Sequence, residues 1–201
     1  MTFCCRLGDE YASKENILYE SDNFFVIPAL GQMGIEGYVL LCSKEHYLGM
    51  GNIPKEYELE LEKILKKIKK ILSEIYNSEI LVFEHGPSLG CHRGGGCLDH
   101  GHFHLIPTSV DIMYFLNEKF KTEKIKNFNR LREIYKNQQS SYLFIETQDN
   151  KRYIIEVDSP IPSQYLRQVI ASKLVISNWD WRIDSDLETF KKTVEKLKNK
   201  F

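Results

Sequence analysis

The sequence predicts an α+β fold, in which helices cover the faces of a mainly antiparallel sheet. Three observations predict it. Aromatic and β-branched runs pair as hairpins in both halves of the chain, one long amphipathic helix separates two groups of strands, and helices follow the second hairpin. The 201 residues are somewhat more than the roughly 150 of a usual domain, which indicates one compact domain with an appended segment.

The first predicted elements are the two strands of a hairpin. Residues 16–20 (NILYE) and 23–28 (NFFVIP) flank the turn-forming pair Ser21-Asp22. A loop, GQMGIEG, then leads to residues 37–43 (GYVLLCS). The nearly unbroken apolar run at 37–43 predicts a central strand that is buried on both faces.

The clearest helix begins at Pro54 and reaches Tyr76. Its apolar side chains recur at spacings of three and four residues, while lysines fill the opposite face. We interpret the lysine face as a solvated surface, in preference to a binding surface.

Two strands and a loop are expected after this helix. Residues 79–86 (EILVFEHG) predict a strand, residues 87–97 (PSLGCHRGGGC) a glycine-rich loop, and residues 98–107 (LDHGHFHLIP) a second strand with period-two alternation. The charged residues 111–137 are expected to be helical.

A second hairpin and two helices complete the predicted order. The hairpin has strands at 141–147 (SYLFIET) and 152–157 (RYIIEV). Two prolines break the chain before a short helix at 163–173, and a terminal helix at 186–198 would be capped by Ser185 or Asp184.

Composition and charge exclude several classes of protein. The 42% apolar and 27% charged fractions are those of an ordinary globular protein. With 27 basic and 28 acidic side chains, no global field would hold a nucleic-acid duplex or an anionic membrane, so any phosphate must be bound by local geometry. No apolar run approaches the ~20 residues that cross a bilayer. The N-terminus lacks the apolar segment of a secretory signal, and the five cysteines are an odd number. We therefore expect a cytoplasmic protein with reduced thiols.

The most informative feature is a row of histidines. His100, His102 and His104 are three of the six histidines and alternate with Gly101 and Phe103. On a strand, this alternation places the three imidazoles on one face, about 6.6 Å apart along the backbone. A lone histidine is usually structural, but such a row has no use in packing and predicts a functional site. Neutral imidazole is also a good nucleophile at phosphorus.

A metal site is the alternative interpretation of the row. Two histidines at i and i+2 can share a tetrahedral ion. Three in line extend over about 13 Å of strand, so one straight strand cannot easily wrap all of them around one ion.

The motif H-x-H-x-H, followed by two apolar residues and Pro107, resembles the signature of the histidine triad (HIT) family. Upstream, residues 23–46 resemble the first half of the family and end in His46, and the long helix follows where the family has one. FEHG, the glycine-rich loop and C-x-D-H-x-H-x-H resemble a bacterial branch in particular. The likeness divides the chain into a HIT-like core at 1–110 and a C-terminal extension at 111–201.

This resemblance implies the HIT-like α+β fold, often as a homodimer, and nucleotidyl or phosphoryl transfer through a covalent histidine intermediate. His102 matches the nucleophile, His100 and His104 match the flanking triad members, and His46 matches a fourth histidine near the same phosphate. The expected enzyme is a nucleotide hydrolase or transferase that acts on a phosphoanhydride, a phosphoramidate or a dinucleoside polyphosphate. A non-catalytic nucleotide sensor or a metal-binding protein is the alternative.

The glycine-rich loop suits the same role. Gly94, Gly95 and Gly96 can bring backbone N–H groups close to an anion, and Arg93 could add charge-assisted donors. Cys97 stands where many family members have a hydroxyl residue near the phosphate, and packing alone is the alternative role for it. We therefore expect Arg93, Gly95, Gly96 and Cys97 to bind phosphate.

Other positions depart from the family pattern. Leu30 or its neighbours stand where many members have an Asp that holds a ribose, and Glu84 stands where many have Asn. Some members bind a structural zinc through a C-x-x-C pair, whereas Cys4 and Cys5 are adjacent here, which disfavours that zinc. No cofactor is expected to be required, although a divalent metal could accompany the substrate phosphates.

The extension carries a weaker resemblance. SQYLRQVIA and NWDWR resemble the C-terminal extension of some larger HIT-like proteins. Tyr165, Arg167, Trp179 and Arg182 could form a stacking and charged surface over the triad, and we expect at least one of them within reach of it. In the alternative interpretation the two tryptophans only anchor the extension to the core. His85 and His92 are left unassigned.

Overall fold

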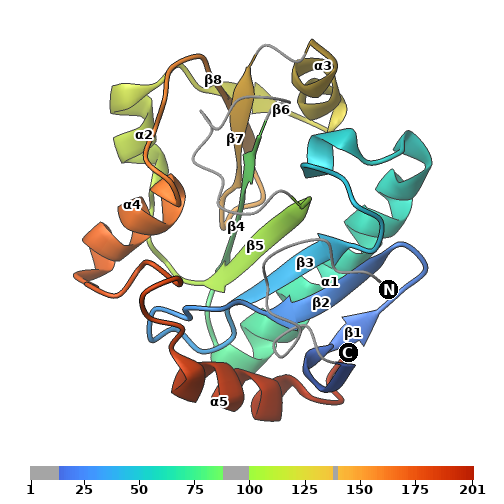
Figure 1. Ribbon diagram of the computed structural model, residues 1–201, viewed down its shortest axis with the longest axis vertical. Coiled ribbons are helices and arrows are strands. Elements are labelled where there is room, and N and C mark those ends of the chain that lie inside the picture. Colours follow the sequence, from blue (N-terminus) through green and yellow to red (C-terminus); the bar gives the residue numbers. More distant parts are fainter. Residues whose placement is uncertain (1–13, 88–99, 138–139) are drawn as a thin grey trace.

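One sheet organises the chain in the computed structural model, which describes residues 14–87, 100–137 and 140–201. The sheet has eight strands in the order β1-β2-β3-β5-β4-β7-β8-β6, and every described pair of neighbours is antiparallel (Figure 1). The α+β fold class that the sequence predicts is thereby confirmed.

The first hairpin consists of β1 (Tyr19–Glu20) and β2 (Phe24–Pro28), as predicted. A short 3-10 helix, Lys14–Asn16, precedes it. β3 (Val39–Ser43) lies between β2 and β5, and all five of its residues are buried. Its apolar run is therefore explained by a central position with packing on both faces.

The long helix α1 covers Glu58–Tyr76 after a 3-10 turn at Lys55–Tyr57, close to the predicted start at Pro54. Another short 3-10 helix, Met50–Asn52, precedes that turn. The helix ends at Asn77, which is left-handed with φ 47°. Its buried stripe packs on the sheet and consists of Leu61, Ile64, Leu65, Ile68 and Leu72.

The strands β4 (Ile80–Gly86) and β5 (His102–Pro107) pair with one another, with Phe83 opposite His104. Strand β5 also pairs with β3, so it is central in the sheet. It begins later than the predicted residues 98–107, because His100 and Gly101 precede the strand.

The stretch 111–137 is only partly helical, which corrects the prediction. Between α2 (Met113–Lys119) and α3 (Asn129–Asn137) lies a short strand, β6 (Glu123–Ile125), which pairs with β8. Three residues are too few for a periodic pattern to reveal a strand. The position is fixed by tertiary packing instead, since Ile125 is buried in the core.

The second predicted hairpin is confirmed. It consists of β7 (Ser141–Glu146) and β8 (Arg152–Val157). Strand β7 also pairs with β4 over five residue pairs, from Val82 with Glu146 to Gly86 with Tyr142. The segment after residue 110 thus continues the same sheet as the segment before it.

The helices α4 (Tyr165–Leu174) and α5 (Leu187–Leu197) close the chain. The cap of α5 differs from the prediction of Ser185 or Asp184. The Asp186 side chain accepts the Thr189 N–H, whereas Asp184 accepts the N–H of Asp186. Asp184 therefore orients the capping residue and does not cap the helix itself.

Two hydrophobic clusters, one on each face of the sheet, form the core. Helices α1 and α3 contribute to the cluster with Phe103 and Leu105, while α2 and α4 contribute to the cluster with Leu40 and Phe83 (Figure 1). Within the described ranges, no helix combines the length and the apolar character that crossing a membrane requires.

Candidate active site

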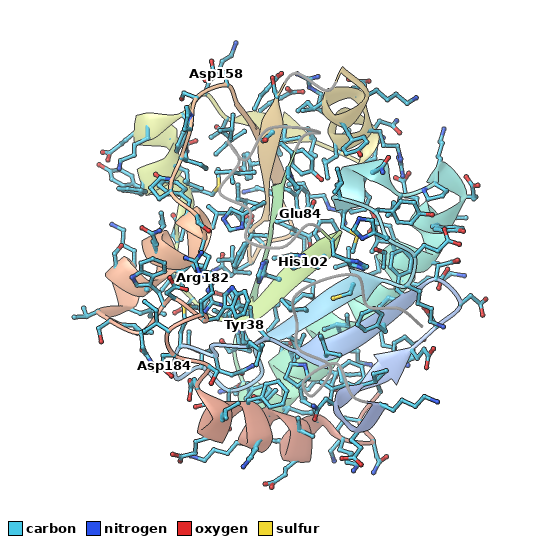
Figure 2. All side chains as sticks on the ribbon, viewed as in Figure 1. Tyr38, Glu84, His102, Asp158, Arg182 and Asp184 are labelled. Atoms are coloured by element: carbon cyan, nitrogen blue, oxygen red, sulfur yellow. The ribbon has the colours of Figure 1, made fainter. Side chains whose placement is uncertain are left out.

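The central strand β5 carries two members of the histidine row. His102 and His104 lie on the sheet face that α2 and α4 cover, with only 7% and 5% of their surface exposed. Phe103 and Leu105 enter the opposite cluster, as the predicted alternation requires. Figure 2 shows His102 in the middle of the molecule, with Tyr38 and Glu84 nearby.

Hydrogen bonds assign the proton positions on the two buried rings. His102 Nδ1 lies 2.6 Å from the His100 carbonyl, which can only accept, so Nδ1 carries the proton and Nε2 of the neutral ring is an acceptor. His102 Nε2 lies 3.0 Å from His104 Nε2, which must therefore donate. His104 Nδ1 is then an acceptor, and the Tyr38 hydroxyl donates to it at 2.7 Å.

Burial keeps both rings neutral. Desolvation lowers the pKa of His102 to about 4, with repulsion from His100 adding to the shift and the bond to the His100 carbonyl opposing it. Desolvation likewise holds the pKa of His104 well below its usual value, and His102, His85 and Arg167 add repulsion. Neutral imidazole is the form that can attack an electrophile.

The other two predicted histidines lie next to one another at the edge of this site. His100 precedes β5, and its Nε2 donates to the Ser43 carbonyl at 2.7 Å. Burial lowers its pKa, and repulsion from His46 contributes. The His46 ring is exposed and lies 5.5 Å from the His100 ring, centroid to centroid. His46 therefore contacts the row through His100.

A third buried histidine, which sequence analysis left unassigned, joins His102 and His104. His85 on β4 is 6% exposed, and its ring lies 6.2 Å from that of His104. Its Nε2 accepts the Leu166 N–H at 3.0 Å, and desolvation lowers its pKa to about 3. Phe83, which is directly opposite His104 in the pairing of β4 with β5, stacks on the His104 ring with 4.4 Å between the centroids. Only the pairing of β4 with β5 reveals this neighbour, because nothing in the local sequence encodes it.

The extension reaches the site through one buried side chain. Arg167 on α4 is 1% exposed and donates to the Tyr38 hydroxyl at 3.1 Å, which places it two hydrogen bonds from His104. Of the other residues that the sequence singles out, Arg182 pairs with Asp180, and the Trp179 side chain packs against the core. Trp179 thus matches the anchoring interpretation.

The loop at residues 30–31 contacts two side chains of the extension, Trp181 and Arg167. A Cβ on Gly31 would lie 2.6 Å from the Cβ of Trp181, and this glycine has a left-handed φ of 63°. Only glycine permits so close an approach at that conformation. The Gly31 carbonyl accepts from Arg167 Nη2 at 2.6 Å.

A buried carboxyl group lies behind β5, on the other face of the sheet. Glu84 accepts from the Met50 N–H and from the Tyr142 hydroxyl, both at 2.6 Å. Desolvation raises its pKa to about 8, while hydrogen bonds from Tyr142, Met50 and the His102 backbone oppose the shift. The residue that departs from the family pattern therefore supports the backbone of His102.

The predicted phosphate-binding residues Arg93, Gly95, Gly96 and Cys97 lie outside the described residues, and so do Cys4 and Cys5. Their roles stay predictions. In the part of the chain that the structure describes, no group of three or more His, Cys, Asp or Glu side chains is arranged to hold a metal ion.

No protein-family model matches this chain, and a search of curated proteins found no match. Solved structures do resemble it. A HIT-like protein involved in cell-cycle regulation from Bartonella henselae is 17% identical, with 62% of this chain and 89% of that chain covered and a TM-score of 0.41. A hypothetical histidine triad nucleotide-binding protein from Sulfolobus tokodaii is 19% identical, with 61% and 82% covered and a TM-score of 0.38.

A third similar structure, from Streptococcus mutans, is 19% identical, with 69% of this chain and 85% of that chain covered and a TM-score of 0.45. The first two carry the description of the family that the motif at residues 100–104 resembles. The fold and the site together define an α+β protein with a buried, neutral histidine pair on a central strand.

Proposed function

We propose that this chain is a HIT-type enzyme that hydrolyses or transfers a nucleotidyl group through a covalent intermediate on His102. One observation carries the proposal: the bond from His102 Nδ1 to the His100 carbonyl leaves the lone pair on Nε2 of a buried, neutral ring. The substrate is a nucleoside phosphoanhydride, a phosphoramidate or a dinucleoside polyphosphate.

The reaction has two steps. His102 Nε2 attacks the α-phosphorus, a phosphorus–nitrogen bond forms, and the bond from phosphorus to the leaving group breaks. His104 Nε2, 3.0 Å from His102 Nε2, donates its proton to the leaving group. Water or another acceptor then attacks the phosphorus and gives its proton to His104 Nε2, the phosphorus–nitrogen bond breaks, and both histidines return to their first state.

The remaining contacts complete this proposal. His100 and His46 lie together at the edge of the buried pair, where they would bind phosphate oxygens. Arg93, Gly95, Gly96 and Cys97 would add the donors that an anion requires. A homodimer and a cytoplasmic location are further parts of the proposal.

Rapid-quench trapping with nucleotide radiolabelled at the α-phosphate tests the proposal. We expect adenosine phosphoramidate and diadenosine polyphosphates to be hydrolysed, and the wild type to carry label transiently. Metal analysis of the purified protein accompanies the assay. Nucleotide binding without turnover would favour the sensor, and dependence on added zinc would favour the metal-binding protein.

A further inference from the structure

The buried cation Arg167 has no carboxylate partner among the residues that the structure describes. Every hydrogen bond that the structure describes for Arg167 ends on a neutral oxygen: the carbonyls of Leu30, Gly31 and Trp179, and the hydroxyl of Tyr38. A fully buried charge is costly unless it is compensated. Such a cation is useful where a negative charge develops during the reaction.

The guanidinium is not free to bind substrate. Its Nε and Nη2 both donate to the Trp179 carbonyl, Nη2 also donates to Gly31, and Nη1 donates to Tyr38. The planar fork is therefore locked in place. Any effect of Arg167 on the triad must pass through Tyr38.

A chain of four hydrogen bonds runs from Arg167 to the His100 carbonyl, and all four donate in the same direction. Arg167 donates to the Tyr38 oxygen at 3.1 Å, and Tyr38 donates to His104 Nδ1 at 2.7 Å. His104 Nε2 donates to His102 Nε2 at 3.0 Å, and His102 Nδ1 donates to the His100 carbonyl at 2.6 Å. Each partner has the proton or the lone pair that its neighbour requires.

We propose that Tyr38 and Arg167 are positioning residues that hold His104 in the tautomer with a proton on Nε2 and supply a proton to its Nδ1 when the Nε2 proton leaves. This inference rests on the proposed function. It assigns a role in the reaction to a residue of the C-terminal extension.

The protons balance in both steps. In the first step the leaving group takes the Nε2 proton of His104, and Tyr38 transfers its hydroxyl proton to Nδ1, so the imidazole stays neutral. The resulting phenolate is stabilised by Arg167, whose Nη1 lies 3.1 Å from the oxygen. In the second step the attacking water gives a proton to His104 Nε2, and Nδ1 returns its proton to Tyr38.

The groups that face His104 favour this route over a cationic His104. His102 on its own strand, His85 on β4 and Arg167 on α4 all lower its pKa, and Phe83 covers one face of the ring. A neutral imidazole cannot readily lose its proton unless it gains another on the second nitrogen. Tyr38 is the donor that lies on that nitrogen.

The substitution Tyr38→Phe tests the inference because it removes the hydroxyl and keeps the ring. We measure kcat and KM with two substrates, adenosine phosphoramidate and the 4-nitrophenyl ester of AMP, whose leaving group needs no proton. We expect kcat to fall roughly 10²-fold on the phosphoramidate, little loss on the ester, and an unchanged KM. Equal losses on both substrates would overturn the proton supply.

Nitrogen-15 NMR of the His104 ring gives a readout that does not depend on turnover. The wild type should show a proton on Nε2 alone, and Tyr38→Phe should show a mixture of tautomers with a raised His104 pKa, because the donor that stabilised the neutral ring is gone. An unchanged ring spectrum would refute the positioning role. Absence of label on wild-type His102 would instead refute the proposed function.

Two further variants separate a specific effect from a structural one. Tyr114→Phe makes the same chemical change at an exposed position on α2 and should alter neither the ring spectrum nor the dependence on the leaving group. Arg167→Lys keeps the charge but loses the fork, and it should reproduce the dependence on the leaving group in part. If Arg167→Lys unfolds the protein, Tyr38→Phe still decides the question.

Discussion

The proton on His102 decides what this residue can do. Because the His100 carbonyl accepts from Nδ1, the second nitrogen keeps its lone pair and becomes the nucleophile once the His104 N–H that donates to it turns to the leaving group. His100 thus acts through its backbone as well as its side chain.

Substitution of the three triad residues should show a fixed order of severity. We expect His102→Asn to abolish turnover while the fold and nucleotide affinity persist, because Asn is polar and of similar size but has no nucleophilic ring nitrogen. His100→Asn and His104→Asn should cost roughly 10²- to 10³-fold, since they remove orientation or charge stabilisation. Steady-state kinetics and rapid-quench labelling measure the order. Covalent label on the His102 variant would disprove the assignment.

The pH dependence of kcat/KM should reflect the buried nucleophile. Its pKa is lowered to about 4, so the ring stays neutral as the pH falls through 6.5 and becomes protonated only near 4. We therefore expect kcat/KM to hold level through pH 6 and to decrease near pH 4, because this parameter reports the pKa values of the free enzyme. A decrease centred between pH 6 and 7 would contradict a desolvated His102.

Glu84 should make the fold less stable as the pH rises. Its pKa is raised from 4.5 to about 8, so the folded state keeps a proton that the unfolded state loses between these values. The free energy of unfolding should fall across this window by up to about 1.4 kcal/mol per pH unit. In Glu84→Gln, which resembles the protonated acid, this slope should disappear from urea titrations at successive pH values. Glu195→Gln, at an exposed position, should keep the wild-type slope.

Among the helices and strands, those that a local sequence pattern encodes are predicted best. Both hairpins and the long helix follow from period and turn chemistry alone, and β3 follows from its unbroken apolar run. The strand β6 could not be predicted, because its three residues acquire their role only by pairing with β8. The cap of α5 was misplaced because Asp184 and Asp186 are equally suitable residue types, and only the bonds distinguish them.

Removal of the α5 cap tests which residue performs it. Asp186→Ala should lower the free energy of unfolding by at least about 1 kcal/mol, because the Thr189 and Gly34 N–H groups both lose their acceptor. Ser185→Ala serves as the matched control and should have almost no effect. The two changes are compared by chemical denaturation. A larger loss of stability in Ser185→Ala than in Asp186→Ala would instead support the Ser185 cap that the sequence alone predicts.

At the scale of the whole molecule, the site is assembled from segments far apart in the sequence. The triad motif predicts His102 and His104. Three further residues join them only through the fold: His85 from β4, Tyr38 from the position before β3, and Arg167 from α4. No spacing rule connects residues 38, 85 and 167. These three residues could therefore be predicted only from the order of strands in the sheet, which depends on long-range pairing.

The shared sheet should make both segments unfold together. β7 pairs with β4, and both hydrophobic clusters contain residues from before and after position 110. Both tryptophans lie after that position, so their fluorescence reports the extension, whereas far-UV circular dichroism reports the whole chain. We expect the two unfolding curves to coincide. Separate midpoints would show that the extension unfolds alone.

The pairing of β7 with β4 also affects how copies of this protein meet. A strand on the same chain is present at an effective concentration on the order of millimolar, so a second molecule at ordinary dilution cannot displace β7 by mass action. The outer strands of the described sheet, β1 and β6, are only two and three residues long. Short edges are poor templates for aggregation. The described edges therefore offer little backbone with which a second copy could pair.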